Sequence, residues 1–207
     1  MKLIFLGPPG AGKGTQAELT SRRFGIAHIS TGDMLRAEMR EGTELGLEAK
    51  AFVDRGELVP DDVILGMIAQ RIKQTDCERG FLFDGFPRTL AQAEALRTIA
   101  DIDIVINLDV PAEVIVRRIG GRRMCAGCGA SFHTSTFDGD VCDKCGAALY
   151  VRDDDRPETV ANRIDVYERK TKPLVEFYEK LGLLKTVNAS DSPQTVQGRI
   201  DSLLEAL

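Results

Sequence analysis

The sequence predicts an α/β fold in which two layers of helices cover a mostly parallel, five-stranded sheet. Short apolar runs alternate with helical patterns along the 207 residues, as is typical of parallel sheets covered on both faces. Hydrophobic residues make up 43% and charged residues 29% of the chain, which is ordinary for a globular protein. One stretch, 122–157, breaks the alternation and predicts a small inserted module.

The strands are expected where apolar runs are bounded by glycine, proline or polar residues. They are 3–6 (LIFL), 27–30 (AHIS), 81–84 (FLFD), 103–110 (DIVINLDV) and 183–188 (LLKTVN).

The helices are expected where apolar residues recur at helical spacing. They cover 15–24, 30–42, 44–56, 61–74, 89–100, 111–119, 160–182 and 192–207. Gly25, Gly42 and Gly56 are expected to end the helices before them. Pro111 stands at a favoured first position, and Pro173 predicts a kink in the long segment 160–182.

The net charge of −5 argues against an overall electrostatic attraction to nucleic acid or an anionic membrane. No apolar run approaches the length of a membrane span, and the run 3–6 is too short for the core of a signal peptide. We therefore expect a cytoplasmic protein with neither nucleic acid nor membrane as a partner. Five cysteines in that reducing compartment argue against a disulfide framework.

The stretch 7–15 (GPPGAGKGT) connects the first strand to the first helix. A glycine-rich turn at this position can direct several backbone N–H groups at one anion, and the helix N-terminus adds the positive end of its dipole. Lys13 adds a mobile charge for the outer phosphates. We interpret the stretch as a phosphate-binding loop and the fold as a P-loop NTPase type with three layers. A plain turn with an incidental lysine is the alternative.

This loop departs from the usual motif at one position. A serine or threonine that ligates magnesium normally follows the lysine, but here Gly14 comes between Lys13 and Thr15. The Thr15 hydroxyl can still meet a phosphate. Asp84, at the carboxyl end of the strand 81–84, is the candidate to organise the magnesium through its waters. A capping role is the alternative for Asp84.

Four of the five cysteines lie in the inserted module, as two C-x2-C pairs. They are Cys125, Cys128, Cys142 and Cys145. Four thiolates suit a tetrahedral structural zinc with no open position for catalysis. Gly129 and Gly146 let the backbone curl so that amides face the sulfurs. Iron, two disulfides or four free thiols are the alternatives.

Four motifs occur in order along the chain. They are GPPGAGKGT (7–15), STGDMLR (30–36), RGELVPD (55–61) and DGFPRTLAQ (84–92). With the later RRIGGRR (117–123) and RDDDRPETVANR (152–163), the chain resembles the adenylate kinases over its full length. The resemblance implies reversible phosphoryl transfer from Mg-ATP to AMP, giving two ADP. It also implies Mg²⁺ as cofactor and a zinc-bearing lid of the long bacterial type; a monomer is expected.

The resemblance also implies domains and site residues. It divides the chain into a core (1–29, 60–121, 159–207), an AMP-binding domain (30–59) and a lid with a zinc knuckle (122–158). The ATP-binding residues are Gly10, Ala11, Gly12, Lys13, Gly14, Thr15, Arg118, Arg122, Ser131, Phe132 and Ser192. The AMP-binding residues are Thr31, Arg36, Glu57, Leu58, Val59, Gly85, Phe86, Pro87, Arg88, Gln92, Arg152 and Arg163. The catalytic set is Lys13, Asp84, Arg88, Arg122, Arg152 and Arg163.

An arginine-rich site agrees with the chemistry. Phosphoryl transfer needs in-line positioning and cations around the equatorial oxygens rather than covalent help, and arginine binds phosphate bidentately while staying charged. No general base is expected, because a phosphate oxygen of AMP is already a nucleophile. For Arg123 and Arg156 surface ion pairs are an equal alternative. The two histidines, His28 and His133, are expected to be structural or solvated.

Two other functions stay open. Another nucleoside monophosphate kinase would use the same scaffold, although Thr89 stands where related pyrimidine nucleotide kinases usually have asparagine, which favours adenine. The second alternative is a nucleotide-dependent zinc-ribbon module that binds nucleic acid. Against it, the cysteine module carries the acidic stretches DGD and RDDD and lacks a basic stripe interleaved with aromatics.

Overall fold

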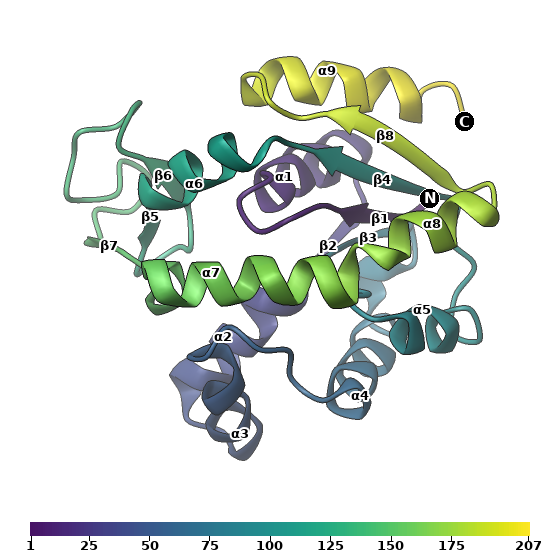
Figure 1. The fold of residues 1–207 in the computed structure, drawn as a ribbon, viewed down its shortest axis with the longest axis horizontal. Helices are drawn as coiled ribbons and strands as arrows, with labels where there is room; N and C mark the ends of the chain where they lie inside the picture. Colours follow the sequence, from purple (N-terminus) through teal and green to yellow (C-terminus); the bar gives the residue numbers. More distant parts are fainter.

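A parallel five-stranded sheet forms the centre of the computed structural model, which describes residues 1–207 (Figure 1). Its strands are β1 (Lys2–Leu6), β2 (Ala27–Ser30), β3 (Phe81–Asp84), β4 (Ile104–Asp109) and β8 (Leu184–Asn188), in the order β2-β3-β1-β4-β8. Phe5 pairs with Asp84 on one side and Ile106 on the other. The loop after β1 and Asp84 at the end of β3 therefore lie at the same edge of the sheet. The five predicted strands and their parallel arrangement are confirmed.

Successive residues of β1 point into two different cores, as the pleat of a strand requires. Leu3 and Phe5 pack with α1 (Lys13–Phe24), α6 (Ala112–Gly120) and α9 (Pro193–Leu204). Ile4 and Leu6 pack on the opposite face with helices that follow β2 and β3 and with one late helix. These are α2 (Thr31–Glu41), α3 (Glu44–Val53), α4 (Asp61–Arg71), α5 (Leu90–Leu96) and α8 (Pro173–Lys180). The predicted three-layer arrangement is confirmed.

Most predicted helices form, but several of their ends differ from the expectation. Gly25 and Gly42 are left-handed C-caps, as predicted. Helices α3 and α5 are shorter than predicted, because the chain beyond them tightens into turns closed by i→i+3 bonds; the Gly56 amide donates to Val53 and the Thr98 amide to Ala95. Pro111 is the N-cap of α6 and not its first helical residue.

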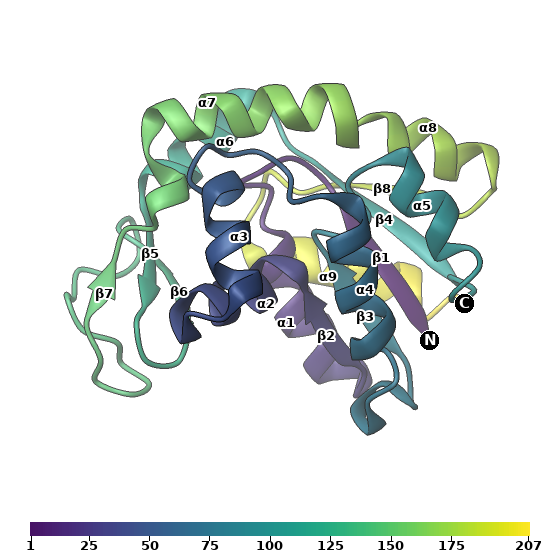
Figure 2. The same ribbon diagram turned by 90° about the horizontal axis from the view of Figure 1, so that it is seen from below.

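The long segment predicted to kink near Pro173 consists of two helices joined by a wider turn. Helix α7 (Pro157–Val166) leads into a π-helical turn, η3 (Tyr167–Thr171), and α8 begins at Pro173. The Lys172 amide donates to the Tyr167 carbonyl at 2.9 Å, an i→i+5 bond. Figure 2 shows α7 and α8 crossing the whole molecule along one side. The predicted irregularity is therefore confirmed, and it lies in the turn before the proline.

The inserted module forms a separate sheet at one end of the molecule (left in Figure 1). Strands β5 (Arg122–Cys125), β6 (Ser131–His133) and β7 (Leu149–Tyr150) pair antiparallel in the order β6-β5-β7. The 3₁₀ turn η2 (Asp153–Asp155) leads from it into α7, and a second 3₁₀ turn, η1 (Thr75–Cys77), precedes β3. The break in the αβ alternation is thus confirmed as an insertion.

None of the helices combines the length and the apolar character that crossing a membrane would require.

Helices α2 and α3 form a hairpin that depends on close backbone contact at Gly46. A Cβ on Gly46 would lie 2.2 Å from the Glu38 carbonyl oxygen, so any side chain there must push the helices apart. We predict that Gly46→Ala lowers the free energy of unfolding by about 1–3 kcal/mol, measured by urea denaturation. Gly66→Ala in α4 is the matched control, because nothing lies within 4 Å of its Cβ position; it should add up to about 1 kcal/mol. Equal effects of the two substitutions would refute this account.

Candidate active site

The glycine-rich loop between β1 and α1 presents free amides at the start of a helix. The backbone N–H groups of Gly12, Lys13, Gly14 and Thr15 have no acceptor within the protein. Gly12 has a φ of 94°, a conformation that favours glycine. Four unsatisfied donors at a helix N-terminus form a binding site for an anion such as phosphate. The loop has the strand–loop–helix context that its sequence requires.

Lys13 lies across this loop without a carboxylate partner. Its ammonium group donates to the carbonyls of Gly7 at 2.7 Å and Pro8 at 2.9 Å. Burial lowers the pKa of Lys13 to about 8; the charge of Asp84 opposes this shift, and Arg88 contributes most among the cations that add to it. An anion bound at the loop would give the Lys13 ammonium group the negatively charged partner that it lacks within the protein.

Arg88 follows β3, and both its backbone amide and its backbone carbonyl are hydrogen-bonded to other residues. Its amide donates to Oε1 of Gln92 at 2.7 Å, its carbonyl accepts from the Thr171 hydroxyl at 2.8 Å, and its Nε donates to the Gly85 carbonyl at 2.7 Å. Its two terminal nitrogens bond to no protein group. Burial lowers its pKa. The Arg88 guanidinium is therefore fixed in position, and its two terminal nitrogens are free for bidentate binding of phosphate.

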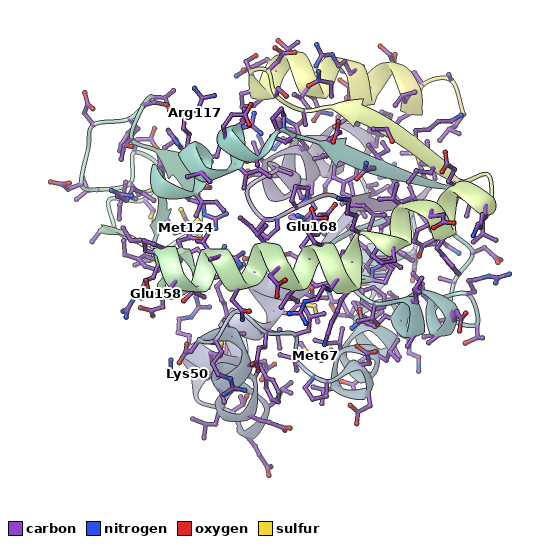
Figure 3. The ribbon with its side chains drawn as sticks, viewed as in Figure 1. Lys50, Met67, Arg117, Met124, Glu158 and Glu168 are labelled. Carbon is purple, nitrogen blue, oxygen red and sulfur yellow. The ribbon has the colours of Figure 1, made fainter.

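Three further arginines are gathered around two buried carboxylates of the turn η2. Both oxygens of Asp155 accept from Arg122, and Arg152 donates to Asp154 at 2.7 Å. Arg163, on α7, reaches Asp154 at 3.1 Å and Asp155 at 3.0 Å. The Asp155 side chain is 0% exposed. The turn lies where β5, which carries Met124, meets the start of α7, which carries Glu158 (Figure 3).

The charges of this cluster stabilise one another. Burial by itself would raise the pKa of Asp154, but Arg163 and Arg152 hold it well below its usual range. Burial lowers the pKa of Arg163 to about 10, and Asp154 opposes that shift. Asp154, Arg152 and Arg163 therefore stay ionised at neutral pH. We name Arg122, Arg152, Arg163, Asp154 and Asp155 the arginine–aspartate cluster.

A cavity enclosing about 670 Å³ of space, open to solvent, lies between α2, the end of α3 and the arginine–aspartate cluster. Ten of the twelve residues expected at AMP line it: Thr31, Arg36, Glu57, Leu58, Val59, Gly85, Arg88, Gln92, Arg152 and Arg163. Phe86 is 0% exposed and packs in the core against Phe83, and Pro87 lines a neighbouring cavity.

The neighbouring cavity, of about 530 Å³, joins the phosphate loop to the first. Lys13, Arg88 and Arg163 line it together with Gly7 and Pro9 of the loop. Arg88, Arg163, Leu58 and Gly85 line both cavities. The two cations without carboxylate partners, Lys13 and Arg88, thus face one space.

Asp84 lies beside the phosphate loop, and Gly14 leaves room for it. A Cβ on Gly14 would be 3.3 Å from Oδ2 of Asp84. His28, on β2, brings Nε2 to 3.4 Å from the same oxygen. Asp84 is 9% exposed. A buried carboxylate next to the free amides of Gly14 and Thr15 fits the outer sphere of a hydrated Mg²⁺ held with phosphates.

The residues expected at the ATP base are more scattered. Arg118 donates to the carbonyls of Ala11 at 3.2 Å and Ala189 at 2.8 Å, and so ties the phosphate loop to the loop before α9. Ser192 caps α9 by accepting from the Thr195 amide at 3.2 Å. Ser131 and Phe132 lie on β6 in the inserted module. Ser131, Phe132 and Ser192 line neither cavity.

The four cysteines of the inserted module converge on one point. Their sulfurs lie within 4.8 Å of one another. The amides of Gly127 and Cys128 donate to the Cys125 sulfur at 3.3 and 3.4 Å, and the hydrogen bond from the Cys128 amide is the main cause that lowers the pKa of Cys125 to about 6. Four thiols so placed can bind a metal ion in a closed site. None of them lines either cavity.

Sequence reasoning did not single out Asp154, Asp155, Asp61 or Thr171. Asp61 accepts from Thr89 at 2.9 Å and from Gln92 at 2.7 Å, and so fixes the loop that carries Arg88. The sequence offered only part of a signal for the two aspartates, because RDDDRP places acids directly after Arg152, the arginine of that stretch expected at a nucleotide. Arg123 and Arg156 bond outside both cavities, Arg156 to the exposed Asp153 at 2.8 Å.

A glycine-rich loop with free amides, at the carboxyl edge of a parallel sheet and surrounded by cations, defines the class of P-loop proteins that bind nucleotide phosphates. The family model "Adenylate kinase" matches residues 5–183. Relatives named adenylate kinase include one from Methanosarcina mazei, 52% identical over 99% of this chain and 98% of its own. Another, from Bacillus thuringiensis strain Al Hakam, is 51% identical over the whole of both chains. The chain belongs to the adenylate kinase family, the ATP:AMP phosphotransferases.

The arginine–aspartate cluster predicts an acid-sensitive stability. Because folding lowers the pKa of Asp154, its carboxylate stabilises the fold above the unfolded pKa of about 3.9, and this contribution is lost as the pH falls through the folded value. Asp154→Asn should lower the free energy of unfolding by about 3 kcal/mol at pH 7, and the difference from wild type should shrink below about pH 4. Urea denaturation at both pH values tests this, with the exposed Asp153→Asn as control. A constant difference across that range would contradict it.

Proposed function

We propose that ATP binds with its phosphates on the loop 7–15, that AMP binds in the larger cavity, and that the phosphoryl group passes between them in the neighbouring cavity. The observation that carries the proposal is the pair of cations without carboxylate partners, Lys13 and Arg88, lining the one space that joins the loop to the larger cavity. Charge spread over a transferring phosphoryl group needs such cations.

Each group then has a role in the transfer. The free amides of Gly12 to Thr15 hold phosphates of ATP, and Lys13 leaves its two carbonyls to reach the outer phosphate. Arg88 orients the AMP phosphate, whose oxygen is the nucleophile. Arg122, Arg152 and Arg163, fixed by their carboxylates, surround the equatorial oxygens. Gln92 already bonds to Arg88 and Asp61 and offers its remaining hydrogen-bonding capacity to the base.

Magnesium and the domain motions belong to the same proposal. Bound Mg²⁺ would neutralise phosphate charge. Asp84 and Thr15 are the groups of this chain that would hold its waters or the neighbouring phosphates. Arg118 and Ser192 frame the ATP base, and Ser131 and Phe132 would reach it from the lid. Segments 30–59 and 122–158 would close over the nucleotides and exclude water, which otherwise competes for the phosphoryl group.

Zinc is the metal that the four-cysteine cluster fits best, as a structural ion of the lid. Cys125, Cys128, Cys142 and Cys145 would supply all four ligands of a tetrahedral zinc and leave no position for a substrate. The lid buries little apolar surface, so the metal would replace a core. We further propose that the enzyme is a cytoplasmic monomer that does not bind nucleic acid; a compartment that keeps these thiols reduced agrees with metal binding.

The first test concerns the two cations. Lys13→Ala and Arg88→Ala should each lower turnover by about 10²–10³-fold, because each removes charge next to the transferring group. The assay is ATP and AMP formation from ADP and Mg²⁺. Arg156→Ala removes an arginine that is exposed and paired with Asp153, and it should retain nearly full activity. Near-normal turnover in both cation variants would overturn the assignment.

The second test concerns magnesium. Asp84→Asn should reduce magnesium-dependent activity more than Thr15→Ala, because the carboxylate organises the hydrated ion while the hydroxyl has one phosphate contact to lose. Turnover is measured against Mg²⁺ concentration for both variants and wild type. The opposite ranking would make Thr15 the main partner of the metal.

The third test concerns the lid metal. Elemental analysis should find zinc in the purified enzyme, and Cys142→Ser should lose much of it, whereas Cys77→Ala, a cysteine outside the cluster, should keep it. Removal of the metal should lower the melting temperature and loosen the lid, with partial activity left at moderate temperature. A metal-free sample that melts like the original would show that the site is not structural.

A further inference from the structure

Thr171 is buried in the middle of a long helical segment whose neighbouring side chains are exposed. It ends the π-helical turn η3, is 9% exposed, and follows three exposed residues, 168–170. Glu168 marks this turn in Figure 3. Thr171 lines the smaller cavity with Arg88 and Arg163, yet nothing in the transfer chemistry described above uses it.

The Thr171 hydroxyl does not make the bond that a helical threonine usually makes. Such a hydroxyl commonly returns to the carbonyl four residues earlier, which here belongs to Tyr167. The Tyr167 carbonyl instead accepts from the Lys172 amide in the i→i+5 bond of the π-turn. The Thr171 hydroxyl donates to the Arg88 carbonyl at 2.8 Å, across 83 residues of sequence. That carbonyl has no backbone partner.

The π-turn is what directs Thr171 toward the site. In a regular α-helix, Thr171 would be rotated about 80° around the axis from Arg163, eight residues before it. One extra residue in the turn brings it back to within about 20° of Arg163. Arg163 and Thr171 therefore lie on one face of the segment, and both reach the cavity that Lys13 and Arg88 line.

We propose that Thr171 is a positioning residue for Arg88, and that the π-turn couples Arg88 to the helix that carries Arg163. The inference rests on the proposed role of Arg88 at the AMP phosphate. The Arg88 backbone is fixed at its amide by Gln92, from its own loop and helix, and at its carbonyl only by Thr171. Without the hydroxyl, the Arg88 carbonyl loses its one partner, and the backbone that carries the guanidinium is no longer tied to the π-turn that follows α7. A 1 Å displacement of a phosphate-binding group can cost about 10²-fold in rate.

The experiment compares Thr171→Val, which keeps the shape and removes the hydroxyl, with Thr171→Ser, which keeps the hydroxyl. Thr98→Val is the matched control, because Thr98 also donates to a backbone carbonyl at 2.8 Å but lies outside the site. Thr171→Val should raise the KM for AMP about tenfold and leave the KM for ATP within about twofold. Thr171→Ser should keep the wild-type KM for AMP, and Thr98→Val should also leave that KM unchanged.

A double-mutant cycle separates positioning from a general structural effect. In the Arg88→Ala background, Thr171→Val should change the KM for AMP by less than about twofold, because the residue it positions is gone. If Thr171→Val proves too unstable to assay, Thr171→Ala below its melting temperature carries the same prediction. An unchanged KM for AMP in Thr171→Val, an equal rise for ATP, or full additivity with Arg88→Ala would overturn the inference. Near-normal activity of Arg88→Ala itself would instead overturn the proposed function.

Discussion

Two buried carboxylates hold three arginines of the candidate active site together. Asp154 and Asp155 bring the guanidinium groups of Arg122, Arg152 and Arg163 into one cluster. Three partly buried guanidinium groups without these acids would repel one another and lose part of their hydration uncompensated. The acids come from the turn η2, which leads from the inserted module into α7, so the position of the arginines depends on how that module joins α7.

Lys13 and Arg88 differ from the three clustered arginines in what holds them. Both are held by neutral backbone carbonyls and not by carboxylates, so their charge is left for a ligand. A chain with a net charge of −5 thus keeps two cations without carboxylate partners, Lys13 and Arg88, in the smaller cavity. The four-cysteine site of the inserted module lies outside this arrangement, and none of its cysteines lines either cavity.

The parts of the molecule that local sequence encodes could be predicted. Strand runs such as FLFD, the glycine-rich loop and the cysteine pairs depend on a few neighbouring residues. Asp154 and Asp155 could not be predicted to be buried, because RDDD has the composition of a solvated stretch; only its folding against α7 buries two of the three acids, while Asp153 stays 71% exposed. Thr171 was missed because a π-turn leaves no periodic trace in the sequence, and its partner lies 83 residues away.

The most direct measurement is a crystal structure of the enzyme with a non-hydrolysable ATP analogue and AMP. The account predicts phosphate oxygens within hydrogen-bond distance of Nζ of Lys13 and of the terminal nitrogens of Arg88, with the Arg152–Asp154 and Arg122–Asp155 pairs intact. Phosphates bound elsewhere would contradict it, with Lys13 still hydrogen-bonded to the Gly7 and Pro8 carbonyls and no phosphate at the terminal nitrogens of Arg88.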